Sequence, residues 1–341
     1  MTTTTTTTIP TAIGYSTNLP ATDPAALTER TIETPTPGPH DLVVEVVAVS
    51  VNPVDVKLRA GAPSGGFRVL GFDAAGIVRA TGEKVTLFSP GDEVFYAGSI
   101  DRPGTNQRLH LVDERIVGRK PVALSFADAA ALPLTAITAW ETLFDRFALT
   151  QESTGTLLVI GATGGVGSAM LQLAEALLPG VTVIATASDP ERAAWARDLG
   201  AEHTVNHRGD LAAEVLALAP GGVDWLFTAH SDGQIPLYAQ IVRPFGEITA
   251  IDDGPRDVSP LKSKSITWHW ELMFTRPVQQ TDDLIEQHRL LNRVADLADE
   301  GRLRTTAIRT LSPITAETLR EAHELVETGR TIGKVVLHDW A

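Results

Sequence analysis

The sequence contains no cysteine, and this absence excludes several kinds of chemistry at once. Without thiols there is no disulfide framework, no thiolate nucleophile and no cysteine-ligated zinc or iron–sulfur site. Basic residues are also in the minority, because 28 Lys and Arg stand against 42 Asp and Glu and give a formal net charge of -14. Such a surface repels phosphate backbones, so we expect no nucleic-acid partner.

Long apolar runs are missing as well. No stretch approaches the roughly 18 consecutive apolar residues of a membrane-spanning helix, so we expect no membrane partner. The start of the chain, Met1 followed by Thr2 to Thr8, has neither the basic nor the apolar region of a signal peptide. We therefore expect a cytoplasmic protein that begins with a disordered, threonine-rich tail over residues 1–10.

The rest of the chain is typical of a globular protein of about two domains, with 43% hydrophobic and 21% charged residues among 341. Residues 11–127 contain short β-branched runs, such as 42–51 and 74–81, which alternate with turns rich in Gly and Pro. This pattern predicts a compact, β-rich barrel or sandwich.

Residues 128–277 show a different pattern, in which short apolar strands alternate with helical stretches. Alternation of this kind predicts an α/β domain with a doubly wound parallel sheet. The expected strands cover 156–160, 181–187, 204–205, 223–229 and 247–251. Residues 278–341 carry the expected helices 281–300 and 315–328 and a strand over 334–337, and we expect this segment to return to the first domain.

The sharpest motif is Gly-Ala-Thr-Gly-Gly-Val-Gly over residues 161–167, between a buried strand and a helix. Ala162 replaces the first glycine of G-x-G-x-x-G, whereas Gly164 and Gly167 keep the other two. Gly164 and Gly165 let the backbone approach a pyrophosphate, and Gly167 lets helix and strand pack closely. The helix N-terminus offers free N–H groups to the anion. We therefore predict a dinucleotide site formed by Gly161, Ala162, Gly164, Gly165, Val166 and Gly167.

The end of the next strand indicates which dinucleotide binds. Ala187 and Ser188 stand where NAD sites carry Asp or Glu, and Arg192 follows on the first turn of the next helix. A hydroxyl and a guanidinium suit a 2′-phosphate, so Ser188 and Arg192 favour NADPH. Two alternatives stay open, because Asp189 can hold a ribose or cap the helix, and Arg192 can be a solvated surface residue.

Several motifs together resemble those of a known superfamily. They are VNPVDVK (51–57), LGFDAAG (70–76), GDEV (91–94), PLTAITAWE (133–141), the glycine turn, KSI (264–266) and HWELMFTR (269–276). With these residues the chain resembles the medium-chain dehydrogenase/reductase superfamily. Within it, the match is to the zinc-free quinone oxidoreductase branch, whose members are often labelled zinc-type alcohol dehydrogenase-like.

The resemblance implies a GroES-like catalytic domain built from both chain ends, with a Rossmann domain between them and the cofactor in the cleft. It also implies a homodimer formed through the last strand of the nucleotide domain. Zinc-containing members carry Cys at the place of Asn52 and His-Glu at the place of Phe72-Asp73. Phe72 cannot bind a metal and Asn52 is a poor zinc ligand, so we expect no metal site.

The resemblance also assigns roles to single residues, each with a plainer alternative. Asn52 is a catalytic candidate whose amide can donate to a substrate oxygen, or it simply begins the Asn-Pro turn. Asp55 either helps to hold the cofactor or caps the helix that follows. Thr135 matches a position that contacts the nicotinamide, or is an N-cap. Lys334 matches a position that reaches the pyrophosphate, or is a solvated strand lysine.

The substrate side of the expected site is apolar. Phe72, Trp270 and Met273 are candidates for a pocket that accepts a flat molecule, although such side chains also fill cores. Tyr96 is the candidate proton donor.

Without a Lewis acid or a thiolate, the cofactor must carry the chemistry. We expect hydride transfer from NADPH to a quinone or related electron-poor carbonyl. One alternative is an enoyl or 2-alkenal reductase, and another is a non-catalytic NADPH-binding structural or sensing protein.

Overall fold

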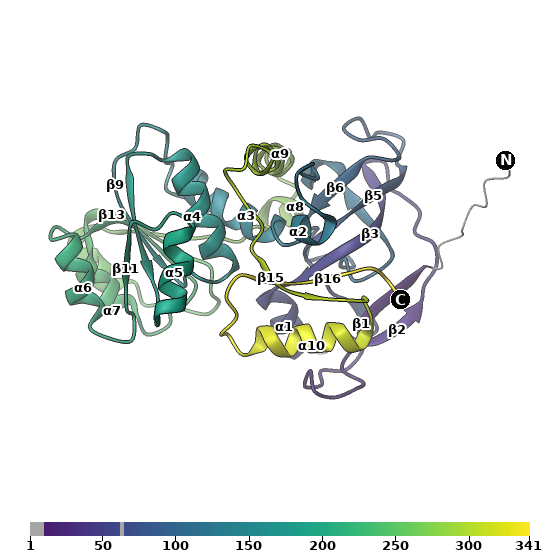
Figure 1. The fold of residues 1–341 in the computed structure, drawn as a ribbon, viewed down its shortest axis with the longest axis horizontal. Helices are drawn as coiled ribbons and strands as arrows, with labels where there is room; N and C mark the ends of the chain where they lie inside the picture. Colours follow the sequence, from purple (N-terminus) through teal and green to yellow (C-terminus); the bar gives the residue numbers. More distant parts are fainter. Residues whose placement is uncertain (1–9, 62–64) are drawn as a thin grey trace. The chain divides into compact units, whose positions relative to one another are not determined.

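The computed structural model describes residues 10–61 and 65–341, which form two compact units (Figure 1). One unit comprises the described residues up to Leu134 together with Phe274–Ala341, and the other comprises Thr135–Met273. The boundaries predicted from the sequence lie between residues 127 and 128 and between residues 277 and 278. Residues 1–9 of the predicted tail lie outside the described residues. Within the described ranges, no helix is long and apolar enough to span a bilayer.

Six parallel strands form the sheet of the unit 135–273. Their order is β11-β10-β9-β12-β13-β14, the order of a doubly wound dinucleotide-binding sheet, so the predicted Rossmann architecture is confirmed. The last three residues of each central strand, β9, β10 and β12, are buried, as expected where helices cover both faces of the sheet. The strands are β9 (Gly155–Ile160), β10 (Val181–Thr186), β11 (His203–Val205), β12 (Val223–Thr228), β13 (Val242–Ala250) and β14 (Thr267–Trp270).

The helices of this unit begin where the sequence supplies caps. Asp189 accepts a hydrogen bond from the backbone N–H of Arg192 at the start of α5, and Asp210 does the same for Ala213 in α6. The helical elements are α3 (Pro133–Trp140), which crosses the division, the π-helix η2 (Glu141–Arg146), α4 (Gly165–Leu177), α5 (Pro190–Asp198), α6 (Leu211–Leu218), α7 (Ile235–Ile241) and the 3-10 helix η3 (Ser259–Lys264).

The other unit is built on a seven-stranded sheet, in which β15-β16-β3-β5-β6-β8 are neighbours in that order and β7 pairs with β3. A three-stranded sheet, β2-β1-β4, accompanies it. The predicted GroES-like, β-rich domain is thereby confirmed. The strands are β1 (Thr11–Tyr15), β2 (Thr28–Thr31), β3 (Asp41–Val51), β4 (Arg68–Val69), β5 (Ala74–Thr81), β6 (Glu93–Tyr96), β7 (Leu109–Asp113), β8 (Val117–Arg119), β15 (Ala307–Leu311) and β16 (Lys334–His338).

One strand pairing positions the site described below. The C-terminal strand β16 runs antiparallel to β3, with Val335 opposite Val51, and the two lie side by side in Figure 1. Lys334 and Asn52, the residues next to this pair, are therefore brought together from opposite ends of the chain. The helical elements of the unit are α1 (Pro53–Ala60), η1 (Glu114–Ile116), α2 (Phe126–Ala130), α8 (Thr275–Gln279), α9 (Glu286–Asp299) and α10 (Ala316–Glu327).

Two elements differ from the sequence-based expectation. The predicted helix over 281–300 begins only at Glu286, because a turn precedes it in which Asp283 accepts hydrogen bonds from Arg276. Strand β14 was not predicted. Its residues, Thr267–Trp270, mix exposed and half-buried side chains at the edge of the sheet and show no apolar run.

Candidate active site

The glycine turn joins β9 to α4 and leaves the start of that helix open. Gly161 has φ +80°, a conformation that favours glycine, and its carbonyl accepts a hydrogen bond from the N–H of Gly164 at 3.1 Å. Gly164 is the N-cap of α4 and has no side chain to satisfy the first-turn N–H groups. These groups are therefore available to an anion, and the turn fits a dinucleotide pyrophosphate.

The last glycine of the turn has a packing role. A Cβ on Gly167 would lie 2.5 Å from Ala162 Cα and 2.5 Å from Gly161 O, far inside contact distance. A Cβ on Gly164, in contrast, would have Gly161 O as its nearest neighbour, at 3.5 Å. The two glycines thus serve different purposes: Gly167 permits close packing, and Gly164 leaves space.

This contrast gives a matched pair of substitutions. We expect Gly167→Ala to destabilise the fold by about 1–3 kcal/mol, because backbone atoms must move. Gly164→Ala should fold normally and bind a nicotinamide dinucleotide at least about tenfold more weakly, because its methyl group fills the approach of the phosphates. Chemical unfolding measures the stability of both variants, and titration with the cofactor measures their affinity for it. Wild-type affinity in a folded Gly164→Ala protein would contradict the assignment of the turn.

The residues predicted to read the 2′-phosphate lie together at the end of β10. Asp189 links them, since its Oδ2 accepts Ser188 Oγ at 3.1 Å and Arg192 Nη1 at 2.6 Å. The hydrogen bonds from the backbone and side chain of Arg192 lower the pKa of Asp189 to about 2. Asp189 is thus the helix cap, and it holds the Arg192 guanidinium beside the Ser188 hydroxyl.

Sequence reasoning missed further basic groups in this region. The pKa of His207 is lowered, first by partial burial and then by the charges of Arg208, His230 and Arg192. These residues follow β10, β11 and β12, whose carboxyl ends share one edge of the sheet. The signal in the sequence was only that His207-Arg208 follows a short strand. Two arginines, Arg192 and Arg208, therefore lie at this edge of the sheet, in a chain whose net charge is -14.

A buried polar network occupies the other unit. Asn52 Nδ2 donates to Asp73 Oδ2 at 2.7 Å, and Lys334 Nζ donates to Asn52 Oδ1, to Asp73 Oδ2 at 3.1 Å and to Val51 O at 3.1 Å. Asp73 Oδ1 accepts the N–H of Leu134 at 2.8 Å. Lys334 is only 4% exposed. The structure therefore places Lys334 in a network with Asn52, where all three ammonium hydrogens have acceptors, instead of leaving it free to reach a pyrophosphate.

Asp55 belongs to the same buried region and supports the backbone around Asn52. Its Oδ2 accepts the N–H of Asn52 and its Oδ1 accepts the N–H of Gly71, both at 2.8 Å. The capping alternative expected Asp55 to precede a helix over 56–59, but α1 begins at Pro53 with Asn52 as its N-cap. Asp55 is the third residue of this helix and stabilises its start as the second member of a capping box. Burial raises its pKa to about 7 against the pull of these hydrogen bonds. Burial also raises the pKa of Asp73, which the Lys334 ammonium opposes.

Tyr96, the candidate proton donor, is fully buried in β6 and bonds to a histidine. Its hydroxyl lies 3.1 Å from His110 Nδ1, and the two rings stack with centroids 5.4 Å apart. His110 Nε2 lies 3.0 Å from Pro103 O and must donate to it, so Nδ1 is the acceptor for the tyrosine proton. Burial lowers the pKa of His110 to about 4 and raises that of Tyr96. The hydroxyl hydrogen of Tyr96 is thus engaged inside the fold.

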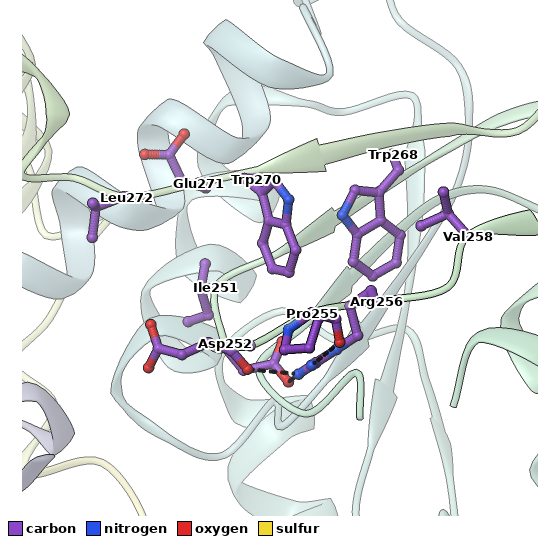
Figure 2. A pocket seen from close by; sticks show the side chains of 11 residues that line it. Ile251, Asp252, Pro255, Arg256, Val258, Trp268, Trp270, Glu271 and Leu272 are labelled. Carbon is purple, nitrogen blue, oxygen red and sulfur yellow. Dashed lines mark hydrogen bonds and ion pairs between the residues drawn. The ribbon is translucent and has the colours of Figure 1, made fainter. Parts of the chain in front are cut away.

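The predicted pocket residues do not share one environment. Phe72 is buried and packs edge-to-face on Phe274, with centroids 5.3 Å apart, whereas Met273 is buried in the other unit. Trp270 is 47% exposed and lines a pocket of about 540 Å³ within the unit 135–273 (Figure 2). Trp268 and Trp270 form one wall of it, and the loop after β13 forms another. Thr135 is buried within α3.

Two family profiles match the chain. One, described as an alcohol dehydrogenase GroES-like domain, covers residues 38–133, and one described as a zinc-binding dehydrogenase covers residues 165–272. The zinc-type alcohol dehydrogenase-like protein of Staphylococcus epidermidis is 36% identical over 334 residues, 96% of this chain and 99% of that protein. The 2-methylene-furan-3-one reductase of Solanum lycopersicum is 28% identical over 320 residues, 91% of this chain and 74% of that protein.

Solved structures agree with these matches. A Rhizobium etli protein, solved under the name of a zinc-dependent alcohol dehydrogenase, superposes with a TM-score of 0.93 at 51% identity and covers 97% of this chain and 98% of its own. A quinone oxidoreductase of Pseudomonas syringae gives a TM-score of 0.83 at 26% identity, covering 96% of this chain and 99% of its own.

Fold, site and relatives together define a two-domain oxidoreductase that uses a nicotinamide cofactor and acts on a small molecule. The chain belongs to the medium-chain dehydrogenase/reductase superfamily, as its motifs predicted.

The residues at the family's catalytic zinc position do not fit zinc. Phe72 has no donor atom, and the donor atoms of Asn52 and Asp73 face the Lys334 ammonium, a cation that already occupies the space between them. Across the part of the chain that the structure describes, no three His, Asp or Glu side chains are grouped to hold a metal. The described residues at this position therefore do not form a zinc site.

Proposed function

We propose that this protein is a zinc-independent oxidoreductase that uses NADPH to reduce quinones or related electron-poor carbonyl compounds. The observation that carries the proposal is the buried Lys334–Asn52–Asp73 network at the family's metal position. A site without a Lewis acid suits acceptors whose own conjugation spreads the negative charge of reduction. Quinones and α,β-unsaturated carbonyls are acceptors of this kind.

The cofactor, when bound, supplies the hydride, and the chain supplies its position. The N–H groups at the start of α4 hold the pyrophosphate across Gly164 and Gly165. Ser188 and Arg192 bind the 2′-phosphate, with Arg192 held in place by Asp189. Arg208, whose charge is felt at neighbouring His207 together with that of Arg192, adds positive potential around the same phosphate.

At the acceptor, Asn52 carries the main role. Negative charge develops on the carbonyl oxygen as the hydride arrives, and an N–H donor placed there stabilises it. Asn52 Nδ2 has two hydrogens, and only one is engaged, with Asp73. We assign the second to the carbonyl oxygen.

A second candidate function is reduction of an enone double bond, which the name of the tomato relative supports. That reaction also needs a proton at carbon. Because the Tyr96 hydroxyl donates to buried His110, water is the simpler proton source. A quinone needs no positioned donor at carbon, so the described residues favour quinone reduction.

We also propose a homodimer. Strand β14 is the last in the parallel sheet, and its outer edge has no neighbouring strand within the described residues. Light scattering of the purified protein measures its mass in solution, which should be twice that of one chain.

Titration with NADPH and NADH tests the cofactor assignment. We expect NADPH to bind at least about tenfold more tightly, because a charge-assisted hydrogen bond contributes about 1.5–3 kcal/mol. Arg192→Ala should weaken NADPH binding by about 10- to 100-fold and leave NADH binding nearly unchanged. Arg197→Ala, in the same helix but bonded to Thr204, is the matched control.

Equal affinity of the wild type for NADPH and NADH would contradict the assignment of NADPH as the cofactor. Tight NADPH binding with no turnover of quinones or enones would favour the alternative of a non-catalytic sensing or structural protein.

A further inference from the structure

Lys334 is a buried cation surrounded by three oxygen atoms. They are the carbonyl oxygen of Val51, the amide oxygen of Asn52 and the carboxylate oxygen Oδ2 of Asp73. An ammonium group has three hydrogens, so donors and acceptors match in number. Burying an ammonium is costly unless it is paired and hydrogen-bonded, and here it is both.

The position of this ammonium is informative. Residue 52 is a position that carries a ligand in zinc-containing relatives, and residue 73 directly follows another, Phe72. The Lys334 nitrogen is hydrogen-bonded to the side chains of both Asn52 and Asp73. Phe72, at the place of the histidine of those relatives, packs on Phe274. A single positive charge is thus bonded to the side chain at one of the positions from which those relatives bind a divalent ion.

We propose that Lys334 acts as an internal cation in place of the metal, fixing and polarising the Asn52 amide for the acceptor carbonyl; this proposal rests on the function proposed above. Lys334 is a positioning residue, because it acts through Asn52. It takes no part in binding the pyrophosphate.

The first effect is orientation. The ammonium can face only the oxygen of the Asn52 amide, and the Asp73 carboxylate can face only its nitrogen. A flipped amide would set donor against donor and acceptor against acceptor. The second Nδ2 hydrogen, which has no acceptor in residues 10–61 and 65–341, therefore has a fixed direction.

The second effect is polarisation. A cation that donates to an amide oxygen draws electron density from the amide nitrogen and makes its hydrogens stronger donors. Low dielectric surroundings enlarge this effect, and all three side chains are nearly inaccessible to solvent. A neutral amide thereby gains part of the electrophilic character that a metal ion would supply.

The test compares the full-length wild type with Lys334→Met. We expect kcat for quinone reduction to fall by about 10- to 100-fold, the size of one lost charge-assisted hydrogen bond. The Kd for NADPH should stay within about twofold of the wild type. Lys84→Met, at an exposed turn of the same unit, is the matched control and should change neither quantity.

A double variant shows whether Lys334 acts through Asn52. If it does, Asn52→Ala/Lys334→Met should be no slower than Asn52→Ala alone. If kcat of the double variant falls by the product of the two single losses, the two residues act independently and the proposal is overturned. So would a Kd for NADPH weakened tenfold or more with kcat unchanged, because Lys334 would then be a pyrophosphate ligand.

A spectroscopic readout does not depend on turnover. The chain has five asparagines, so selective ¹⁵N-Asn labelling gives a simple spectrum, and Asn52→Ala identifies the side-chain signal of residue 52. Loss of the cation should move this signal upfield in Lys334→Met, and an unmoved signal overturns the proposal. Should Lys334→Met fail to fold, Lys334→Gln, which keeps donors without charge, is measured with the same expected outcomes.

The same readout separates this proposal from the proposed function. If the wild type reduces neither quinones nor enones, the proposed function fails, and the Asn52 signal still decides whether Lys334 polarises the amide.

Discussion

Replacing Asn52 with alanine is expected to lower kcat for quinone reduction by about 100- to 1000-fold, the usual cost of removing one donor to a developing oxyanion. The substitution removes the N–H that we assign to the acceptor oxygen. We expect KM for the quinone to change much less than kcat, because the bond strengthens mainly as charge develops. Steady-state kinetics at saturating NADPH measure both quantities.

The controls for this experiment address folding and the cofactor. Asn52 belongs to the buried network, so its loss also removes bonds to Lys334 and Asp73. Thermal unfolding and the Kd for NADPH must therefore be recorded for the same protein. Asn292→Ala removes an amide that accepts the N–H of Arg119 away from the site, and its kcat should stay near the wild-type value. A folded Asn52→Ala protein with wild-type kcat would rule out the assigned role.

The nucleotide unit could be predicted from sequence because its signals are local. Each buried strand is a short apolar run, and each helix begins at a cap such as Asp189 or Asp210. The glycine turn needs only neighbouring residues to define its shape. Strand β14 escaped prediction because an edge strand with mixed exposure lacks both the apolar run and regular alternation.

The buried network of Lys334, Asn52 and Asp73 could not be predicted in the same way. Lys334 and Asn52 are 282 residues apart, and only the pairing of β16 with β3 brings them together. From sequence alone, Lys334 was a surface lysine or a phosphate ligand, and neither alternative contained Asp73. The stacking of Tyr96 on His110 could not be predicted either, because which residues face each other across strands depends on the register of the sheet.

Acid should destabilise the fold strongly through His323. This histidine is fully buried in α10, and its Nδ1 accepts a hydrogen bond from Arg59 Nε at 3.3 Å. Burial, followed by the charge of Arg59, lowers its pKa to about 3 from the ordinary value of 6.5. A second proton would sit beside a guanidinium and would break the bond that Arg59 donates. His323 therefore stays neutral in the folded protein at pH values where the unfolded chain is protonated.

The sign of the pH dependence follows from this difference. Because the pKa is depressed, the stabilisation is complete above about pH 6.5 and is lost as the pH falls toward 3. The loss is about 1.4 kcal/mol per pH unit, or up to about 5 kcal/mol over the whole range. His110, with its pKa near 4, adds a loss of the same sign, while Asp55, with its pKa near 7, opposes both.

A variant isolates the contribution of His323 from these other groups. His323→Gln keeps an acceptor for Arg59 but cannot titrate. At pH 7 its free energy of unfolding should be no higher than that of the wild type, and at pH 4 it should be clearly higher. Urea unfolding at half-unit steps between pH 4 and 7.5 measures the difference, in which the contributions of His110 and Asp55 cancel. A constant difference across this range would show that His323 is solvated or already charged in the folded protein, and its bond to Arg59 would then have to be absent.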